Sequence, residues 1–194
     1  FLLVTILWGT SVRADSLSIM TFNVENMFDA RHDIGKDDRT YLPKELKTST
    51  SHIESCHRIG VKRWRTQCLY WDWNENIVDQ KLDVVAEVIK QVGGGRGPDI
   101  VALQEVENIS ILERLREQHL AGLGYQPGIL LEGKDRRGID VAFLSRLPML
   151  SLELHSIDFP HSQRSRIGDT RPILEARFRL PSGGYITGFN VHFP

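Results

Sequence analysis

The clearest hydrophobic pattern in the chain predicts an amphipathic helix from Asn74 to Val92. Its apolar positions recur at steps of three and four residues: Val78, Leu82, Val85, Ile89 and Val92. The asparagine at the start can cap the first turn, and a run of three glycines after Val92 ends the helix. A second helix is predicted from Asn108 to about Ala121, with two leucines facing inward.

Short apolar runs bounded by turn residues predict strands on both sides of the long helix. The first is Leu17–Asn23 and the second is Asp99–Gln104. Proline and glycine separate five later candidates: Gln126–Leu131, Ile139–Ser145, Leu150–Ile157, Ile173–Leu180 and Tyr185–Phe193. Helices interleaved with the early strands, followed by strands and hairpins, predict a mixed α/β fold with one sheet packed on another.

The segment from Met27 to Asp72 has no sustained hydrophobic period, so we expect a long ordered loop. It contains both cysteines of the chain, Cys56 and Cys68. Two nearby cysteines in an exported protein predict a disulfide, and two unpaired thiols are the alternative.

The first residues form an apolar run, Phe1–Trp8, which is too short to span a bilayer. Small residues at Val12 and Ala14 then match the pattern that precedes a signal-peptidase cut. We therefore expect residues 1–14 to be the end of a secretory signal, with a buried strand as the alternative, and residues 15–194 to belong to one domain. This predicts a secreted or periplasmic protein. No other segment is long and apolar enough to cross a membrane.

Apolar residues make up 41% of the chain and charged residues 25%, which is typical of a globular protein. The formal net charge is −1, so any nucleic-acid binding must come from a local patch. One such patch is the basic stretch from His57 to Gln67, which holds Arg58, Lys62, Arg63, Trp64 and Arg65. A disulfide-closed basic loop with an aromatic residue can contact a phosphate backbone and stack on a base, and a solvated basic loop is the alternative.

Polar side chains stand at the ends of several predicted strands: Asn23, Glu25, Glu105, Asp140 and His192. Carboxylates, an amide and a histidine together suit a divalent cation and phosphate chemistry. Each also has a structural alternative. The asparagine can close a turn, the glutamate can be a solvated strand end, the aspartate can pair with Arg136 or Arg137, and the histidine can be structural.

Four strings around these residues occur in one order along the chain: Ile19–Asn26, Asp99–Val106, Gly138–Arg146 and Gly188–His192. Together they resemble the endonuclease/exonuclease/phosphatase family, which includes deoxyribonuclease I. The resemblance implies a deoxyribonuclease I-like α/β sandwich of two packed mixed sheets flanked by helices. The family's later Asp-x-Asn and Asp-His strings do not follow His192, so we expect the N-terminal part of such a domain, incomplete at its C-terminus and inactive alone.

The resemblance also implies roles for individual residues. Glu105 matches the principal metal-binding glutamate, with Asn23 and Glu25 beside it. The implied ion is Mg²⁺, with Mn²⁺ or Ca²⁺ as alternatives. His192 matches a histidine that binds or protonates the phosphate, and Asp140 is the candidate for the acid that orients it. Two arginines, Arg171 and Arg137, are candidate phosphate contacts.

These observations predict a divalent-metal-dependent phosphodiester hydrolase, with a secreted endonuclease acting on nucleic acid as the first interpretation. A phosphatase, a sphingomyelinase-like phosphodiesterase or a non-catalytic binding module are the alternatives. The aromatic residues Trp64, Tyr70, Trp71 and Trp73 suit base stacking, contact with a lipid surface, or packing. No obligate protein partner is implied.

Overall fold

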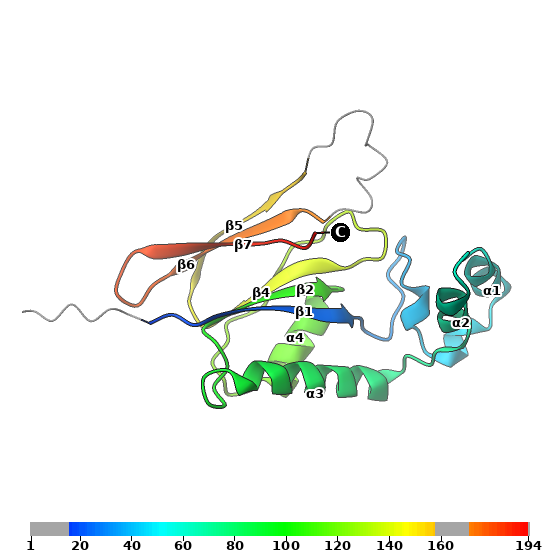
Figure 1. Ribbon diagram of the computed structural model, residues 1–194, viewed down its shortest axis with the longest axis horizontal. Helices are drawn as coiled ribbons and strands as arrows, with labels where there is room; N and C mark the ends of the chain where they lie inside the picture. Colours follow the sequence, from blue (N-terminus) through cyan, green and yellow to red (C-terminus); the bar gives the residue numbers. More distant parts are fainter. Residues whose placement is uncertain (1–15, 158–170, 194) are drawn as a thin grey trace, which may run out of the picture.

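The computed structural model describes residues 16–157 and 171–193, which form two β-sheets packed face to face (Figure 1). The first sheet has the order β1 (Ile19–Met27), β2 (Ile100–Val106), β4 (Asp140–Ser145) and β3 (Ile129–Leu130). The second has the order β5 (Met149–His155), β6 (Ile173–Arg179) and β7 (Tyr185–Asn190). β1 and β2 are parallel, whereas the other pairings are antiparallel. The predicted mixed α/β sandwich is confirmed.

Two helices cover the face of the first sheet that lies away from the second sheet (Figure 1). α3 (Glu75–Gln91) has the predicted start, because Asn74 Oδ1 accepts hydrogen bonds from the backbone N–H groups of Asn76 and Ile77. Its predicted stripe is buried at Val78, Leu82, Val85 and Ile89. α4 (Ile109–Arg114) begins after Asn108 as predicted, but its last turns form the π-helical segment η3 (Leu115–His119) instead of a uniform α-helix.

The two central strands of the first sheet, β2 and β4, are buried on both faces, which explains their nearly continuous apolar sequences. Val101 and Leu103 of β2 pack toward the helices, whereas Ile100 packs toward the second sheet. Phe143 of β4 meets Phe178 of β6 edge to face, with 5.7 Å between ring centroids. The space between the sheets is therefore a packed core that holds the strand ends in place.

The segment predicted as a long loop contains four helical elements, so that prediction is wrong. They are η1 (Arg39–Tyr41), η2 (Lys44–Lys47), α1 (Thr50–His57) and α2 (Lys62–Tyr70). The two α-helices are eight and nine residues long and bury few side chains, so they leave no apolar period in the sequence. We call residues 39–70 the helical arm. It lies beyond the C-terminal end of β1 (Figure 1).

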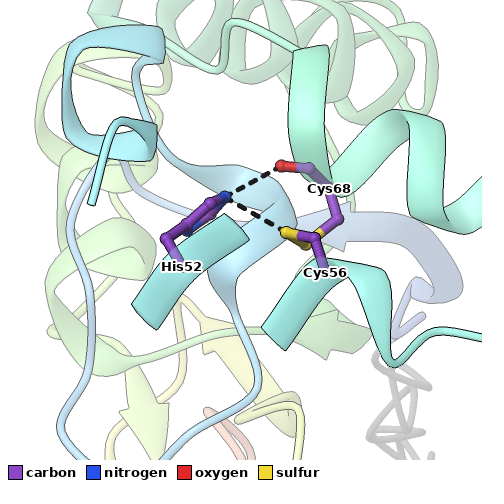
Figure 2. Close-up of side chains that lie close together, drawn as sticks. All are labelled: His52, Cys56 and Cys68. Carbon is purple, nitrogen blue, oxygen red and sulfur yellow. Dashed lines mark hydrogen bonds between the residues drawn. A yellow bond between two sulfur atoms is a disulfide. The ribbon is translucent and has the colours of Figure 1, made fainter. Parts of the chain in front are cut away.

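A disulfide joins the two helices of the arm (Figure 2). Cys56 and Cys68 are bonded as predicted, with their Cα atoms 5.6 Å apart. His52 Nε2 lies 3.2 Å from Cys56 Sγ and 3.1 Å from the carbonyl oxygen of Cys68. That carbonyl belongs to the last turn of α2, where carbonyls lack helical partners, so His52 donates to it. Burial lowers the pKa of His52, which keeps the imidazole neutral.

Several strand ends differ from the sequence prediction. β1 continues past Asn23 to Met27, and its pairing with β2 shifts register between these two residues. β7 ends at Asn190, so His192 lies two residues beyond the strand. Only two residues of the predicted strand Gln126–Leu131 pair in the sheet. No helix among the described residues is long and apolar enough to cross a membrane.

Candidate active site

Three of the predicted residues converge where the ends of β1 and β2 meet the segment after β7. Asn23 Nδ2 lies 3.3 Å from Glu105 Oε1 and 3.4 Å from His192 Nε2. Glu105 Oε1 and His192 Nε2 are 3.5 Å apart. These residues are 82 and 169 positions apart from Asn23 in sequence, so only the sheet pairing and the sheet-on-sheet packing bring them together.

The backbone at these strand ends is strained. Among the described residues, the non-glycine residues with positive φ are Glu25 (53°), Asn26 (63°) and Glu105 (67°). Each such conformation costs on the order of 1–3 kcal/mol and persists only where its surroundings enforce it. Two contacts do so here: Asn26 N–H donates to Glu105 Oε2 at 2.9 Å, and Glu25 N–H donates to Asn23 Oδ1 at 2.9 Å. The result is a Glu105 carboxylate with a defined orientation.

A buried pair of amides ties the two sheets together beside the site. Gln104 Nε2 donates to Asn190 Oδ1 at 2.7 Å. Asn190 Nδ2 donates to the carbonyls of Leu103 and Ala142 at 2.8 and 2.9 Å. Asn190 is the last residue of β7, so this network fixes the point at which the segment that carries His192 leaves the sheet. The sequence prediction did not assign a role to either amide, although both lie inside the strings that carry the family resemblance.

His192 is mostly buried and has two different nitrogen environments. Nε2 faces Asn23 and Glu105, whereas Nδ1 is buried with no hydrogen-bond partner. Burial is the main cause that lowers the pKa of His192. The positive charge of Arg171 lowers this pKa further, whereas the negative charge of Glu105 raises it. The imidazole is therefore neutral at physiological pH, which lets it exchange a proton with a substrate.

Asp140 is buried, so it is not the surface ion-pair partner of Arg136 or Arg137 that one interpretation allowed. Its Oδ1 accepts a hydrogen bond from Gly133 N–H at 3.0 Å, and its Oδ2 has no partner. A Cβ at position 133 would lie 2.5 Å from Oδ1, so this approach requires glycine. Burial raises the pKa of Asp140 to about 7. Asp140 does not orient His192 through a hydrogen bond in this structure. Asp140 Oδ2 and His192 Nδ1 are both buried without a hydrogen-bond partner.

The two candidate phosphate-binding arginines differ in exposure. Arg171 is 4% exposed and pairs with Asp135, with Nη2 and Oδ2 3.3 Å apart, while its Nε is buried without a partner. Arg137 has a side chain that is 51% exposed. The pKa of His192 responds to both cations, so both lie near the converging residues. Asp135 holds Arg171 and also accepts from Arg137 N–H at 2.9 Å, a role that no sequence pattern indicated.

Two more residues near the site carried no signal in the sequence. Lys81 of α3 donates from Nζ to the carbonyl oxygen of Glu25 at 3.0 Å, and burial lowers its pKa while Glu25 and Glu105 raise it. Tyr41 of the helical arm stacks on Phe28 with ring centroids 4.0 Å apart, and burial raises its pKa to about 12. Arg137 and Glu105 also act on that pKa, so the arm borders the site.

The donor set at the strand ends fits a hard divalent cation. Glu105 offers an oriented carboxylate, and the exposed Glu25 offers a second one on the neighbouring strand. Mg²⁺ is commonly held by one or two carboxylates and keeps several waters. Asn23 accepts from the backbone N–H of Glu25 at Oδ1 and presents Nδ2 to Glu105, so it helps to orient the Glu105 carboxylate.

In the described part of the chain, the groups of three potential ligands whose atoms lie within 4.8 Å of one another are two, and neither contains Glu105 or Glu25. One is His52, Cys56 and Cys68, whose sulfurs are bonded to each other and whose imidazole is used by a carbonyl. The other is Glu153, His155 and Glu175 on the open face of the second sheet. There, His155 Nε2 lies 2.7 Å from Glu175 Oε2, so the histidine already has a partner.

The residues predicted to contact nucleic acid lie in the helical arm, at the junction of α1 and α2, rather than in a loop. Arg58 follows α1, and Lys62, Arg63, Trp64 and Arg65 form the first turn of α2. All are exposed except Arg65, which is half-buried and donates from Nη1 to the carbonyl of Ile59 at 3.0 Å. Two further basic residues, Arg164 and Arg166, lie outside the described residues.

The carboxylates, the amide and the histidine at the ends of these strands suit a divalent cation and phosphate chemistry. The model of the Endonuclease/Exonuclease/phosphatase family matches residues 67–193, which is more than half of the chain. The chain belongs to this family, whose members hydrolyse phosphoric esters and generally depend on a divalent metal.

Solved structures that are similar to this chain include two with partial coverage. One is ANGEL2, a 2′,3′-cyclic phosphatase, with a TM-score of 0.45, 16% identity, and coverage of 92% of this chain and 41% of that chain. The other is SmcL, with a TM-score of 0.38, 20% identity, and coverage of 60% and 43%. The chain thus spans less than half the length of both structures. No curated protein sequence matches it.

Proposed function

We propose that this protein hydrolyses phosphodiester bonds with a divalent metal ion held by Glu105. The convergence of Asn23, Glu105 and His192 within 3.5 Å of one another is the observation that carries the proposal. A binding module without catalysis would have no use for two strained strand ends that aim a carboxylate at a neutral histidine.

Each residue has a role that follows from its contacts. Glu105 and Glu25 hold the ion, which we expect to be Mg²⁺, with Mn²⁺ and Ca²⁺ as alternatives. When bound, the ion supplies positive charge to the phosphate oxygens. Asn23 donates to an oxygen of the substrate from Nδ2. His192 exchanges a proton with the substrate at Nε2, because its lowered pKa leaves that nitrogen neutral. Arg171 and Arg137 supply further positive charge to the phosphate.

Nucleic acid is the substrate class that the helical arm supports. The arm has seven lysine or arginine residues and two glutamates, a net charge of +5, whereas the whole chain is −1. The rest of the chain is therefore −6, and the positive charge is concentrated beside the strand ends. The arm also exposes 59% of Trp64 among its cations. Cations that follow a phosphate backbone and an aromatic ring for a base are the usual means of holding single-stranded nucleic acid.

A lipid phosphodiester is the second candidate. It is favoured by a different observation, the exposure of Tyr70 (68%) and Trp71 (43%) next to each other at the end of α2. Amphipathic aromatic residues of this kind also contact membrane surfaces. Trp73 does not contribute to such a rim, because it is half-buried and its Nε1 donates to the carbonyl of Phe28.

Metal binding and turnover test the catalytic proposal. Glu105→Gln should weaken Mg²⁺ or Mn²⁺ binding by at least ~10-fold and nearly abolish hydrolysis of a phosphodiester, with the fold intact by circular dichroism. His192→Ala should lower kcat and leave metal affinity nearly unchanged. Glu87→Gln, an exposed position on α3, is the matched control. Metal binding and turnover are both measured on this chain. Near wild-type rates in both variants would overturn the assignment.

Salt dependence tests the substrate class. Binding of single-stranded DNA or RNA should weaken steeply with salt, and each lost phosphate contact should reduce the logarithmic slope by about 0.7–0.9. The triple variant Arg58→Ala, Lys62→Ala, Arg63→Ala should reduce the slope, whereas Lys90→Ala on α3 should not. A flat salt response, together with binding to sphingomyelin vesicles that requires Tyr70 and Trp71, would favour the lipid substrate instead.

We infer that the protein is exported. The disulfide of the arm supports an oxidising compartment. The proposed secretory signal, residues 1–14, lies outside the described residues. N-terminal sequencing of protein from a secreting host should then begin at Asp15, and an uncleaved N-terminus would refute the proposal.

A further inference from the structure

Two glutamates and a histidine gather on the open face of the second sheet, where β5 is an edge strand. We call Glu153, His155 and Glu175 the β5–β6 cluster. Leu152 and Leu154, which alternate with these residues on β5, pack into the core between the sheets, so the cluster lies on the opposite face. Each member of the cluster offers one ligand atom, and the three atoms lie within 4.8 Å of one another. This spacing is close enough for one metal ion to contact all three.

The pairing of β5 with β6 produces this arrangement. Glu153 and His155 are two residues apart on one strand, so their side chains lie on the same face. Glu175 is directly opposite Glu153 in the antiparallel register and is therefore the diagonal neighbour of His155. The three side chains are thus held by the backbone of a paired sheet, which positions ligands more precisely than a loop does.

The two carboxylates of the cluster have little positive charge beside them, although like charges directly opposite each other on adjacent strands are destabilising. In the described part of the chain, the ion pairs of both glutamates are with His155, which is charged only when protonated. The cation on the same face of β6, Arg177, is turned toward β7, where its guanidinium lies 4.4 Å from the centre of the Tyr185 ring. A cation between the two carboxylates would offset their repulsion.

We propose that the β5–β6 cluster binds a divalent transition-metal ion of the Zn²⁺ class. An imidazole nitrogen and two carboxylate oxygens are zinc ligands, whereas Mg²⁺ and Ca²⁺ prefer oxygen alone. His155 Nε2 already lies 2.7 Å from Glu175 Oε2, and the metal takes the place of the proton that these atoms share. Tetrahedral zinc ligands stand roughly 3.3 Å apart, so this contact must open by roughly 0.6 Å. The Glu153 side chain is 69% exposed and can adjust its position, and water takes the fourth site.

The surroundings of the cluster favour an ordered ion. Phe189 of β7 is opposite Glu175 in the register of the sheet, and its ring centroid lies 6.2 Å from that of the His155 imidazole. An apolar group beside a metal restricts the access of solvent and strengthens the attraction between the ion and its ligands. The ion connects the edge strand β5 to β6 and shares no ligand with the ion proposed at Glu105.

A plain ion pair of the glutamates with a protonated His155 is the competing explanation, and it predicts no response to Zn²⁺. The test is a Zn²⁺ titration by calorimetry in the Glu105→Gln background, so that the result does not depend on the proposed catalytic metal. One Zn²⁺ should bind per chain, and excess Mg²⁺ should not displace it. Because the ion binds the folded state, the thermal midpoint should rise by about 5 °C or more at a hundredfold excess over the dissociation constant.

Glu153→Gln and His155→Ala should each lower the Zn²⁺ affinity at least ~10-fold and remove the rise in midpoint. Circular dichroism and the midpoint in chelator show that both variants are folded. The matched control is His57→Ala, which removes an exposed histidine outside the cluster and should leave Zn²⁺ binding unchanged. The proposal is wrong if the Glu105→Gln protein binds no Zn²⁺, if excess Mg²⁺ displaces the ion, if either folded cluster variant keeps the original affinity, or if the control loses it.

Discussion

Asn190 is the residue through which the two sheets hold each other beside the proposed active site, and replacing it with alanine should destabilise the protein strongly. The side chain is 3% exposed and makes three hydrogen bonds of 2.7–2.9 Å. One accepts from Gln104, and the other two donate to the carbonyls of Leu103 and Ala142 on the opposite sheet. Alanine keeps the backbone of β7 and removes all three.

A typical buried hydrogen bond contributes ~1 kcal/mol net, so the loss of three should lower the free energy of unfolding by ~3 kcal/mol. That corresponds to a fall in the thermal midpoint of ~6–12 °C for a chain of this size. Since Asn190 sets the start of the segment that carries His192, turnover should fall further than stability alone explains. Metal binding at Glu105 should change little, because Glu105 is oriented by Asn26 and not by Asn190.

Urea unfolding followed by circular dichroism measures the loss directly. Thr187→Ala is the matched control, because Thr187 lies on the same strand and has one long hydrogen bond of 3.3 Å from Arg177. It should cost less than ~1 kcal/mol. A loss below ~1 kcal/mol for Asn190→Ala would refute the view that the buried amides join the sheets.

Two further predictions concern stability. The pKa of Asp140 is raised to about 7 in the folded protein, so the native state binds an extra proton between pH ~4 and ~7 and stability is lost as pH rises through this range. Asp140→Asn keeps the acceptor for Gly133 N–H, so it should raise the thermal midpoint at pH 8 relative to wild type and change it little at pH 4. An equal effect at both pH values would show that the buried charge of Asp140 is not the cause. Reducing the disulfide should destabilise the helical arm by roughly 3 kcal/mol, the loop-closure entropy of the crosslink. Amide hydrogen exchange should then become faster in α1 and α2 and stay unchanged in β2. A uniform loss of protection would show that the arm does not unfold as a separate unit.

Regular periodicity in the sequence was sufficient to predict the long helix, its asparagine cap and most of the strands. Each of these elements buries a continuous face against the rest of the fold, so its apolar positions repeat at the spacing of the element. The helices of the arm were missed for the same physical reason. α1 and α2 bury only His52, Cys56 and Cys68, and a disulfide replaces the apolar stripe as the source of their stability.

The site was predictable in its members but not in its geometry. Asn23, Glu105 and His192 could be picked from the order of four strings, because each string follows or closes a buried strand. Lys81, Tyr41 and Asp135 could not, since they reach the site from a helix, the arm and a loop whose positions depend on packing. The strained backbone of Glu105 and the unpartnered oxygens of Asp140 and Glu107 are likewise absent from any pattern of residue types.

The sequence by itself therefore determined the elements that bury an apolar face, the family and the residue types available for chemistry, because local periodicity and short strings record what each segment buries. Only the tertiary structure decided which polar atoms meet and which remain without a partner. Those contacts join residues up to 169 positions apart, and they exist only once β1, β2 and β7 have been brought together by two sheets and a common core.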